Sequence, residues 1–453
     1  MNIEDSALYR EFVTRNAASR AHAERVRRVV PTGTSRALLR HPPFPFFTVR
    51  AAGAHSWDLD GNRRIDFHNN YTAMLHGHAH PAITDVVARQ LTGGSAYSTP
   101  SVQEEALAAL LCERVPALDQ VVFNNSGTEA VMVALRAARA LTGRHRIGKF
   151  EGAYHGSSDF VMVGGHGLPA PDDPRRVTVP LPDIGGLPPA ATADVLLIRY
   201  NDPEAVRAAV QRHGHELATI IVEPVLGAGG VIPAEREFLQ VLRAETARAG
   251  IVLICDEVIT LRQSAGGAQA EYGIAPDLTT MAKIIGGGFP IGAVGGRRDC
   301  MRVFEDPSIG GTVANLGTFS GNAVSVAAGF AAMALFDADA ANALNGLGAS
   351  LRERLTNVLA RHGAAAQVTG AGSLFQIHWT RTRLRDARGA ERGDPTLRLL
   401  TFLGLANRGI HISARGMGCL STPMTSADLD AFAGALDDTL IAMLAEGWPV
   451  QGP

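Results

Sequence analysis

Short runs of apolar residues alternate with amphipathic stretches between about residues 80 and 300. The short apolar runs predict strands at 121–123, 147–150, 218–222 and 251–255. The amphipathic stretches between them predict helices at 127–141 and 235–249. Continuously apolar strands that are separated by helices indicate a parallel sheet with both faces covered.

The N-terminal part of the chain has a different pattern. Residues 5–29 predict one amphipathic helix, which ends before a proline-rich stretch. Residues 47–66 predict a short hairpin, and Asp60-Gly61-Asn62 supplies its turn.

After about residue 322 the chain becomes alanine-rich and mostly helical. The predicted helices lie at 323–335, 340–362, 396–407 and 426–445. The polar segment 381–394 predicts a mobile loop. We therefore expect three parts, namely an N-terminal helix and hairpin segment (1–66), a large domain (67–321) and a smaller α+β domain (322–453).

Composition limits the classes of protein to consider. Of 453 residues, 46% are hydrophobic and 19% charged, which is enough apolar material for a large core. A net charge of −2 gives no overall attraction to nucleic acid or an anionic membrane. The four cysteines lie far apart without metal-ligand spacing, so we expect neither a disulfide framework nor a metal site. Without a signal-peptide pattern or a run of ~18 apolar residues, we expect a cytoplasmic protein.

Only two of the 42 basic residues are lysines, Lys149 and Lys283. Lysine, unlike arginine, can lose its proton when it is desolvated and attack a carbonyl carbon. Lys283 lies among apolar and small residues, with no acidic residue within five positions. This setting suits a Schiff-base lysine, although arginine-rich coding alone also leaves few lysines.

Two motifs follow predicted strands of the sheet. Ser126, Gly127 and Thr128 open a helix, where backbone N–H groups bind phosphate, but they also suit an ordinary helix cap. Asp256 follows the strand 251–255, so its carboxylate points into the crevice where such sheets bind ligands. There it can hold a heterocyclic nitrogen protonated, or it can be a helix cap or a structural ion-pair partner.

Three further side chains complete the pattern. Tyr154 and His155 follow the strand 147–150, and an aromatic ring there can stack on a planar ligand or simply pack in the loop. Thr318 supplies a hydroxyl near glycines. Each signal is weak alone, but phosphate cup, aromatic ring, carboxylate, amine and hydroxyl occur in this order along the chain.

With these motifs the chain resembles the class III aminotransferases, which are pyridoxal 5'-phosphate enzymes of fold type I. The resemblance runs from about residue 30 to 440. Its most specific stretches are 125–130, 150–156, 222–225, 253–258, 276–288 and 317–321. It implies a mostly parallel seven-stranded central sheet with helices on both faces, a smaller α+β domain and a homodimer.

The resemblance also implies residue roles. Lys283 carries the cofactor and acts as the base in proton transfer, and Asp256 pairs with the pyridine nitrogen, so both are catalytic. The implied cofactor-binding residues are Ser126, Gly127, Thr128, Tyr154, Glu223, Asp256, Val258, Lys283 and Thr318. Of these, the first three hold the phosphate, Tyr154 and Val258 cover the ring faces, and Thr318 reaches the phosphate of the partner subunit.

Within this class the chain resembles the β-amino-acid aminotransferases and the glutamate-1-semialdehyde 2,1-aminomutases. Both subgroups place an arginine near Arg36 that binds a substrate carboxylate. Arg415 and the glycine after it resemble the β-amino-acid enzymes, and the alternative is a surface arginine. Tyr71 completes the implied substrate-binding residues. Residues 227–230 read Gly-Ala-Gly-Gly and lack the glutamate of many ω-amino-acid enzymes, which argues against γ-aminobutyrate or ornithine.

These features predict an aminotransferase that moves the amino group of a β-amino acid, with aromatic ones among the candidate donors, to a keto acid such as 2-oxoglutarate or pyruvate. The alternative enzyme is the aminomutase. A cofactor-sensing regulator is disfavoured, because neither terminus offers a basic DNA-binding helix-turn-helix. The sequence leaves the donor, the acceptor and the stereochemistry open.

Overall fold

The computed structural model describes residues 2–164 and 179–452. The chain divides into two compact units. Unit 1 comprises Met1–His80, Ala343–Arg383 and Ala390–Pro453, and unit 2 comprises Pro81–Asn342 and Leu384–Gly389. The three parts predicted from the sequence follow chain order, whereas each unit combines segments that are far apart along the chain.

Unit 2 is built on a seven-stranded sheet with the strand order β4-β14-β13-β12-β9-β5-β8. In that order the strands are Gln120–Asn124, Gly292–Gly296, Leu278–Ala282, Val252–Asp256, Leu217–Val222, Arg146–Phe150 and Val195–Ile198. Only β14 runs opposite to its neighbours, because it pairs antiparallel with both β13 and β4. The predicted mostly parallel seven-stranded sheet is therefore confirmed.

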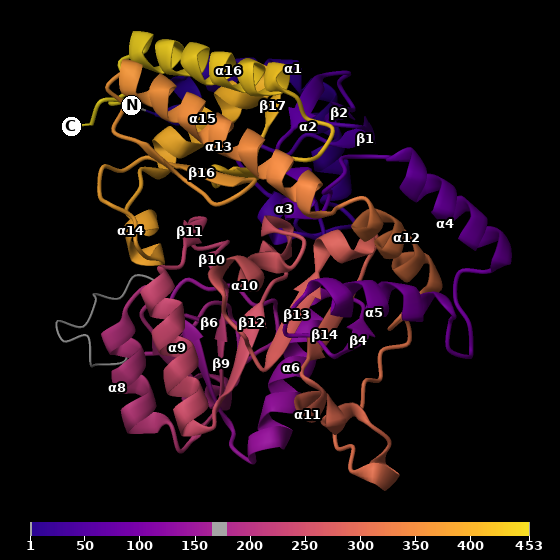
Figure 1. Cartoon of the computed structure of the whole chain (residues 1–453). Coiled ribbons are helices and arrows are strands. Elements are labelled where there is room, and N and C mark those ends of the chain that lie inside the picture. The colour runs from indigo at the N-terminus through magenta and orange to yellow at the C-terminus, as the bar shows by residue number, and fades with distance from the viewer. Residues whose placement is uncertain (1, 165–178, 453) are drawn as a thin grey trace. The chain divides into compact units, whose positions relative to one another are not determined.

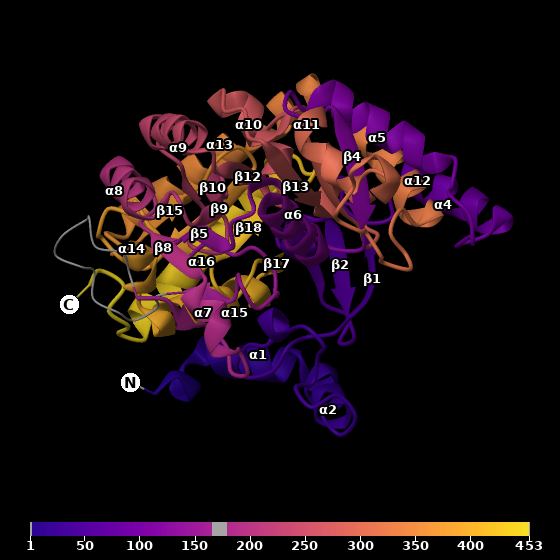
Figure 2. The ribbon, with the colours of Figure 1, turned by 90° about the horizontal axis from the view of Figure 1, so that it is seen from below.

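Helices cover both faces of this sheet (Figures 1 and 2). Helix α6 (Gly127–Thr142) packs on one face through alanines such as Ala134 and Ala138, whose small side chains let the helix approach the strands. Helices α8 (Pro203–His213) and α9 (Arg236–Ala249) pack on the other face, where Phe238 is fully buried. This arrangement matches the fold predicted from alternating strands and helices.

Unit 2 also contains further helices. They are α4 (Pro81–Gly93), α5 (Gln103–Arg114), α7 (Pro189–Ala193), α10 (Gly267–Tyr272), α11 (Arg298–Met301) and α12 (Ala323–Ala334). Two small two-stranded sheets are also present, β6–β7 (Val163–Gly164 with Leu181–Pro182) and β10–β11 (Val225–Leu226 with Ile232–Pro233). Among the described residues, no single helix is long and apolar enough to cross a membrane, and only the bent pair of α12 and α13 (Ala338–Arg361) passes that test.

Unit 1 contains two antiparallel-rich sheets and long helices. One sheet has the order β1-β2-β3-β17 (Thr48–Ala52, His55–Asp58, Arg63–Asp66, Ile410–His411), and the other β15-β16-β18 (Gln367–Thr369, Leu374–His378, Met417–Cys419). Helices α1 (Ala7–Arg15), α15 (Pro395–Asn407) and α16 (Ser426–Ala445) pack together (Figure 1). Strand β3 pairs with β17, and this pairing explains why the N-terminal and C-terminal segments form one unit.

The N-terminal prediction was partly wrong. The helix predicted at 5–29 is broken at Asn16 into α1 and α2 (Ala17–Val26). The break has a tertiary cause, because the carboxylate of Asp60 accepts hydrogen bonds from the backbone N–H groups of Ala18 (2.6 Å) and Ser19 (3.0 Å) at the start of α2. The predicted hairpin is a three-stranded meander, although its turn at Gly61 is present between β2 and β3.

The polar segment 381–394 also differs from the prediction of a mobile loop. It forms the short helix α14 (Ala387–Glu391), and residues Leu384–Gly389 belong to unit 2. Arg385 and Arg388 in this segment both form ion pairs with glutamates of unit 2. The charges that suggested mobility are therefore used in specific contacts.

Candidate functional site

The turn between β4 and α6 holds Ser126, Gly127 and Thr128, which the sequence predicts to bind a phosphate. The hydroxyl of Ser126 accepts a hydrogen bond from the backbone N–H of Glu129 (3.2 Å), so Ser126 is the helix cap that the sequence allowed as an alternative. A Cβ on Gly127 would lie 3.2 Å from the methyl groups of Val258. The first turn of α6 therefore packs against the residues that follow β12. At such a helix start, the first backbone N–H groups have no hydrogen-bond partner within the helix.

Asp256 ends β12 and forms a buried pair with His155. Its Oδ2 lies 2.7 Å from His155 Nδ1, and its Oδ1 accepts a hydrogen bond from the backbone N–H of Val258 (3.0 Å). Burial lowers the pKa of His155, and the neighbouring carboxylate opposes this change. Sequence reasoning gave His155 no role of its own, although its position beside Tyr154 was a usable signal.

Lys283 directly follows β13, the neighbour of β12. The two strands pair in parallel with Asp256 opposite Thr280, so Lys283 lies three residues beyond the partner of Asp256. Its φ angle is +54°, a left-handed conformation that non-glycine residues rarely adopt. Strain of this kind persists where the surrounding structure enforces it, and it is concentrated at functional sites.

Glu223 interacts electrostatically with both Lys283 and Asp256. Burial, followed by the nearby charge of Asp256, raises its pKa to about 8, and Lys283 acts in the opposite direction. Its carboxylate accepts hydrogen bonds from the backbone N–H groups of Tyr154 (3.0 Å) and Gly227 (3.1 Å). Unit 2 thus brings Asp256, Glu223 and Lys283 together, and Glu223 fixes the backbone of Tyr154.

Tyr154 and Thr318 differ from the buried Asp256 and Glu223 because they are exposed. The side chain of Tyr154 keeps 44% of its surface accessible, as a ring that stacks on a ligand needs. Thr318 lies in an exposed segment whose Gly317 approaches Asn125 of the same chain, where an added Cβ would lie 2.9 Å from Asn125 Nδ2. The segment before it is fixed by Asn315 Nδ2, which donates to the carbonyl of Phe123 (2.6 Å).

The predicted substrate residues Arg36, Tyr71 and Arg415 all belong to unit 1 and lie together there. The guanidinium of Arg36 lies 5.3 Å from the ring centre of Tyr71. Burial raises the pKa of Tyr71, and the positive charges of Arg415 and Arg36 oppose that shift. Both arginines are exposed, and both positive charges act on one half-buried tyrosine.

Tyr71 lies in a turn that sequence reasoning missed. Asn69, Asn70, Tyr71 and Thr72 have φ angles of +47°, +50°, +53° and +74°, so α3 (Asn69–Thr72) is a single left-handed turn. Each such residue costs roughly 1–2 kcal/mol. The turn is held by Asn69, whose buried side chain donates to the carbonyl of Cys419 (2.9 Å) and whose backbone N–H donates to Asp66 (2.9 Å).

A cavity of about 290 Å³ lies beside this turn in unit 1. Its lining is mainly apolar and includes Leu38, Phe46, Phe47 and Tyr71. Phe44, which precedes Phe46 and Phe47 in the chain, is not part of this lining. Phe44 is instead 6% exposed and packs on Phe12 in the core, with ring centres 5.7 Å apart.

Comparison with known proteins agrees with this geometry. The model of the family "Aminotransferase class-III" matches residues 39–423. The chain is 41% identical over 429 residues to "Beta-phenylalanine transaminase" of Variovorax paradoxus, covering 94% of both chains. It is 39% identical over 421 residues to "Glutamate-1-semialdehyde 2,1-aminomutase" of Methanothermobacter thermautotrophicus, covering 92% of this chain and 97% of the relative.

Solved structures give the same result. An omega-transaminase from Sphaerobacter thermophilus superimposes with a TM-score of 0.89 at 44% sequence identity, covering 94% of this chain and 97% of that chain.

Proposed function

The chain belongs to the class-III aminotransferase family, whose members are pyridoxal 5'-phosphate enzymes of fold type I, and on that premise we propose that it transfers the amino group of a β-amino acid to a keto acid. The acceptor is 2-oxoglutarate or pyruvate. The proposal rests on one observation above all, namely that the positive charges of Arg36 and Arg415 both act on Tyr71 in unit 1. Two arginines provide one carboxylate-binding fork for the donor and one for the acceptor.

The groups gathered in unit 2 fit the cofactor. The helix N-terminus at Ser126, Gly127 and Thr128 suits a phosphate. The buried Asp256 suits a protonated pyridine nitrogen, and the amine of Lys283 suits an aldehyde carbon. A Cβ at 127 would lie 3.2 Å from the methyl groups of Val258 that we assign to one ring face, so a side chain there would displace Val258 slightly. The exposed ring of Tyr154 covers the other face, and Glu223 holds its backbone.

When bound, pyridoxal 5'-phosphate supplies the electron sink that stabilises negative charge at the carbon next to the amine. Asp256 keeps a proton on the ring nitrogen, and its own position is fixed by His155 and by the N–H of Val258. Lys283 Nζ holds the cofactor at rest and then accepts the proton from the substrate carbon that carries the amine. The left-handed backbone of Lys283 fixes the direction from which this side chain approaches.

Substrate choice follows from unit 1. A β-amino acid has its carboxylate one carbon further from the amine than an α-amino acid has. We assign Arg36 to that carboxylate and Arg415 to the carboxylate of the keto acid. The apolar cavity lined by Leu38, Phe46 and Phe47 suits an aromatic or aliphatic side chain on the donor.

The aminomutase is the second candidate, because a relative with that name is 39% identical. Such an enzyme moves an amine within one substrate and needs no acceptor. Two carboxylate-binding arginines favour the transferase, since a donor and an acceptor each bring a carboxylate.

Purified enzyme should convert 3-amino-3-phenylpropanoate only when a keto acid is supplied. Arg36→Ala should raise the KM of the amino donor at least tenfold, because a charge-assisted pair contributes about 1.5–3 kcal/mol. Arg415→Ala should act mainly on the keto-acid half-reaction. Steady-state kinetics of both half-reactions measure this split. Isomerisation of glutamate semialdehyde without any acceptor would instead establish the aminomutase.

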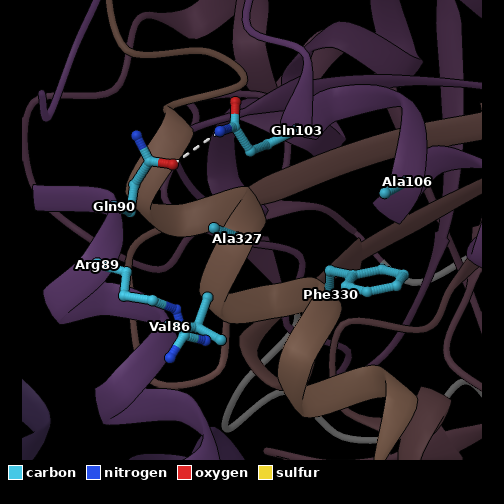
Figure 3. Close-up of a pocket in the computed structure, with 7 residues that line it drawn as sticks. All are labelled: Val86, Arg89, Gln90, Gln103, Ala106, Ala327 and Phe330. Carbon is cyan, nitrogen blue, oxygen red and sulfur yellow. Dashed lines mark hydrogen bonds between the residues drawn. The ribbon is translucent and has the colours of Figure 1, made fainter. Parts of the chain in front are cut away.

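We propose that the functional unit is a homodimer and that unit 2 supplies the interface. A groove of about 350 Å³ lies between α4, α5 and α12, with Val86, Ala106, Ala327 and Phe330 in its lining (Figure 3). Large apolar side chains on the same elements and on the adjoining loops are unusually exposed, namely Leu91, Tyr97, Val102, Leu316, Phe319 and Phe330. Asn322 Nδ2 donates to the carbonyl of Ser95 (2.8 Å) and so joins the loop that carries Phe319 to the loop that carries Tyr97. Exposed apolar patches mark interaction surfaces, and Thr318 lies within this one.

Sedimentation should give a dimer of 47.8 kDa chains. Leu316→Asp should raise the dimer dissociation constant at least about tenfold and release cofactor, because it places a charge in the apolar interface. Ile441→Asp is the control, since Ile441 is also an exposed apolar residue but lies on α16 of unit 1. A fully active monomer would contradict the proposal.

A further inference from the structure

The loop 151–157 after β5 carries Tyr154 and is anchored at several consecutive residues. Tyr154 donates its backbone N–H to Glu223, and His155 pairs with Asp256. At the next residues, the N–H of Ser157 donates to Thr128 Oγ1 (3.2 Å), and a Cβ on Gly156 would lie 2.6 Å from that oxygen. These anchors tie the loop to the same elements to which we assign the cofactor.

The beginning of the loop is held by a different part of the chain. Arg388 forms a bidentate pair with Glu151, with Nε–Oε2 at 2.5 Å and Nη2–Oε1 at 2.9 Å. The two side chains are 17% and 5% exposed, so the pair is largely buried. At the next residue, a Cβ added to Gly152 would lie 2.0 Å from the Cβ of Ala387, and the φ angle of Gly152 is +73°. No other residue type fits at 152 while Ala387 is in place.

Arg388 and Ala387 belong to the segment Leu384–Gly389. This short segment belongs to unit 2, while the chain on either side of it belongs to unit 1. It is fixed to unit 2 at two further points. Arg385 forms a bidentate pair with Glu235 (2.9 and 2.7 Å), and its carbonyl accepts a hydrogen bond from Asn201 (3.0 Å).

We propose that Arg388 is a positioning residue for Tyr154: the segment Leu384–Gly389 clamps the start of the loop 151–157 through Glu151 and Gly152, and thereby sets how tightly Tyr154 covers the cofactor. The proposal rests on the proposed function only in the role that it gives to Tyr154. Cofactor retention by unit 2 then depends on a segment whose two ends continue into unit 1.

The chemistry of the pair supports this role. An arginine fork fixes the carboxylate in both distance and angle, which a lysine cannot do. Removing Arg388 leaves the Glu151 carboxylate buried without this partner, and such a carboxylate is driven toward water. Movement of Glu151 shifts Gly152 and, two residues later, the backbone that positions the Tyr154 ring.

The test compares Arg388→Met with Arg385→Met. Arg388→Met should raise the dissociation constant for pyridoxal 5'-phosphate about tenfold and should weaken the visible circular dichroism of the bound cofactor. Arg385→Met breaks the neighbouring exposed pair and should change the dissociation constant less than about threefold. Arg388→Lys keeps the positive charge without the fork, so its dissociation constant for the cofactor should lie between those of wild type and Arg388→Met. This variant tests the proposal even if Arg388→Met folds poorly.

Glu151→Gln and the double variant Glu151→Gln/Arg388→Met complete a double-mutant cycle on the pair of Glu151 and Arg388. If the two side chains act as one clamp, the double variant should bind cofactor no more weakly than Arg388→Met. Additive losses, or wild-type affinity and dichroism in both Arg388 variants, would overturn the proposal. Failure of the wild-type protein to bind pyridoxal 5'-phosphate would instead overturn the proposed function.

Discussion

Lys283→Ala should lower turnover by on the order of 10⁴-fold or more, because it removes the group that we assign both to cofactor attachment and to proton transfer. The variant should fold, since the residue directly follows strand β13 and alanine removes only its side chain. Its φ of +54° makes glycine the best-tolerated replacement, so Lys283→Gly should be at least as stable as Lys283→Ala. Turnover with 3-amino-3-phenylpropanoate and thermal unfolding measure the two effects.

The scarcity of lysine supplies the control for this experiment. Borohydride reduction of the cofactor-loaded protein should label one peptide, and that peptide should contain Lys283. The other lysine, Lys149, is 1% exposed, and its Nζ donates to the carbonyl of Val161 (2.7 Å). Burial lowers the pKa of Lys149 to about 8, so it is chemically capable but sterically inaccessible. A label on Lys149, or an unlabelled wild-type protein, would contradict the role that we assign to Lys283.

The sequence predicted the parts of unit 2 whose structure depends on local pattern. The strand expected at 251–255 is Val252–Asp256, and the helix expected at 127–141 is Gly127–Thr142. Both follow from hydrophobic periodicity, and Ser126 marks the helix start by capping it. Asp256 and Lys283 lie at the carboxyl ends of neighbouring parallel strands. Because such ends meet at one edge of a sheet, the two residues could be grouped before their contacts were known.

The features that the sequence did not reveal depend on contacts between distant residues. The left-handed turn at Asn69–Thr72 contradicts the local preferences of tyrosine and threonine, and it exists because Asn69 is bonded to the carbonyl of Cys419. The pairing of Arg388 with Glu151 joins residues 237 positions apart. Such pairs leave no periodic signal, because neither partner's neighbours in sequence indicate where the other lies.

Asp256→Ala should lower turnover about 10²- to 10³-fold, which corresponds to roughly 2.7–4 kcal/mol for a preorganised electrostatic contact. The carboxylate is 3% exposed, and in a site with little water its charge acts strongly on a ring nitrogen. Its loss also leaves His155 buried without its partner at Nδ1, so the loop that carries Tyr154 should loosen. Cofactor affinity should therefore fall together with turnover.

Asp256→Asn separates charge from geometry. Asparagine is nearly isosteric, so its side-chain oxygen can still accept from the N–H of Val258, and its amide can still meet the imidazole of His155. We expect this variant to keep most of the thermal stability and cofactor affinity but to lose nearly as much turnover as Asp256→Ala, because only the negative charge favours protonation of the ring nitrogen. Near-wild-type turnover in Asp256→Asn would mean that Asp256 acts by holding His155 and the loop rather than by its charge.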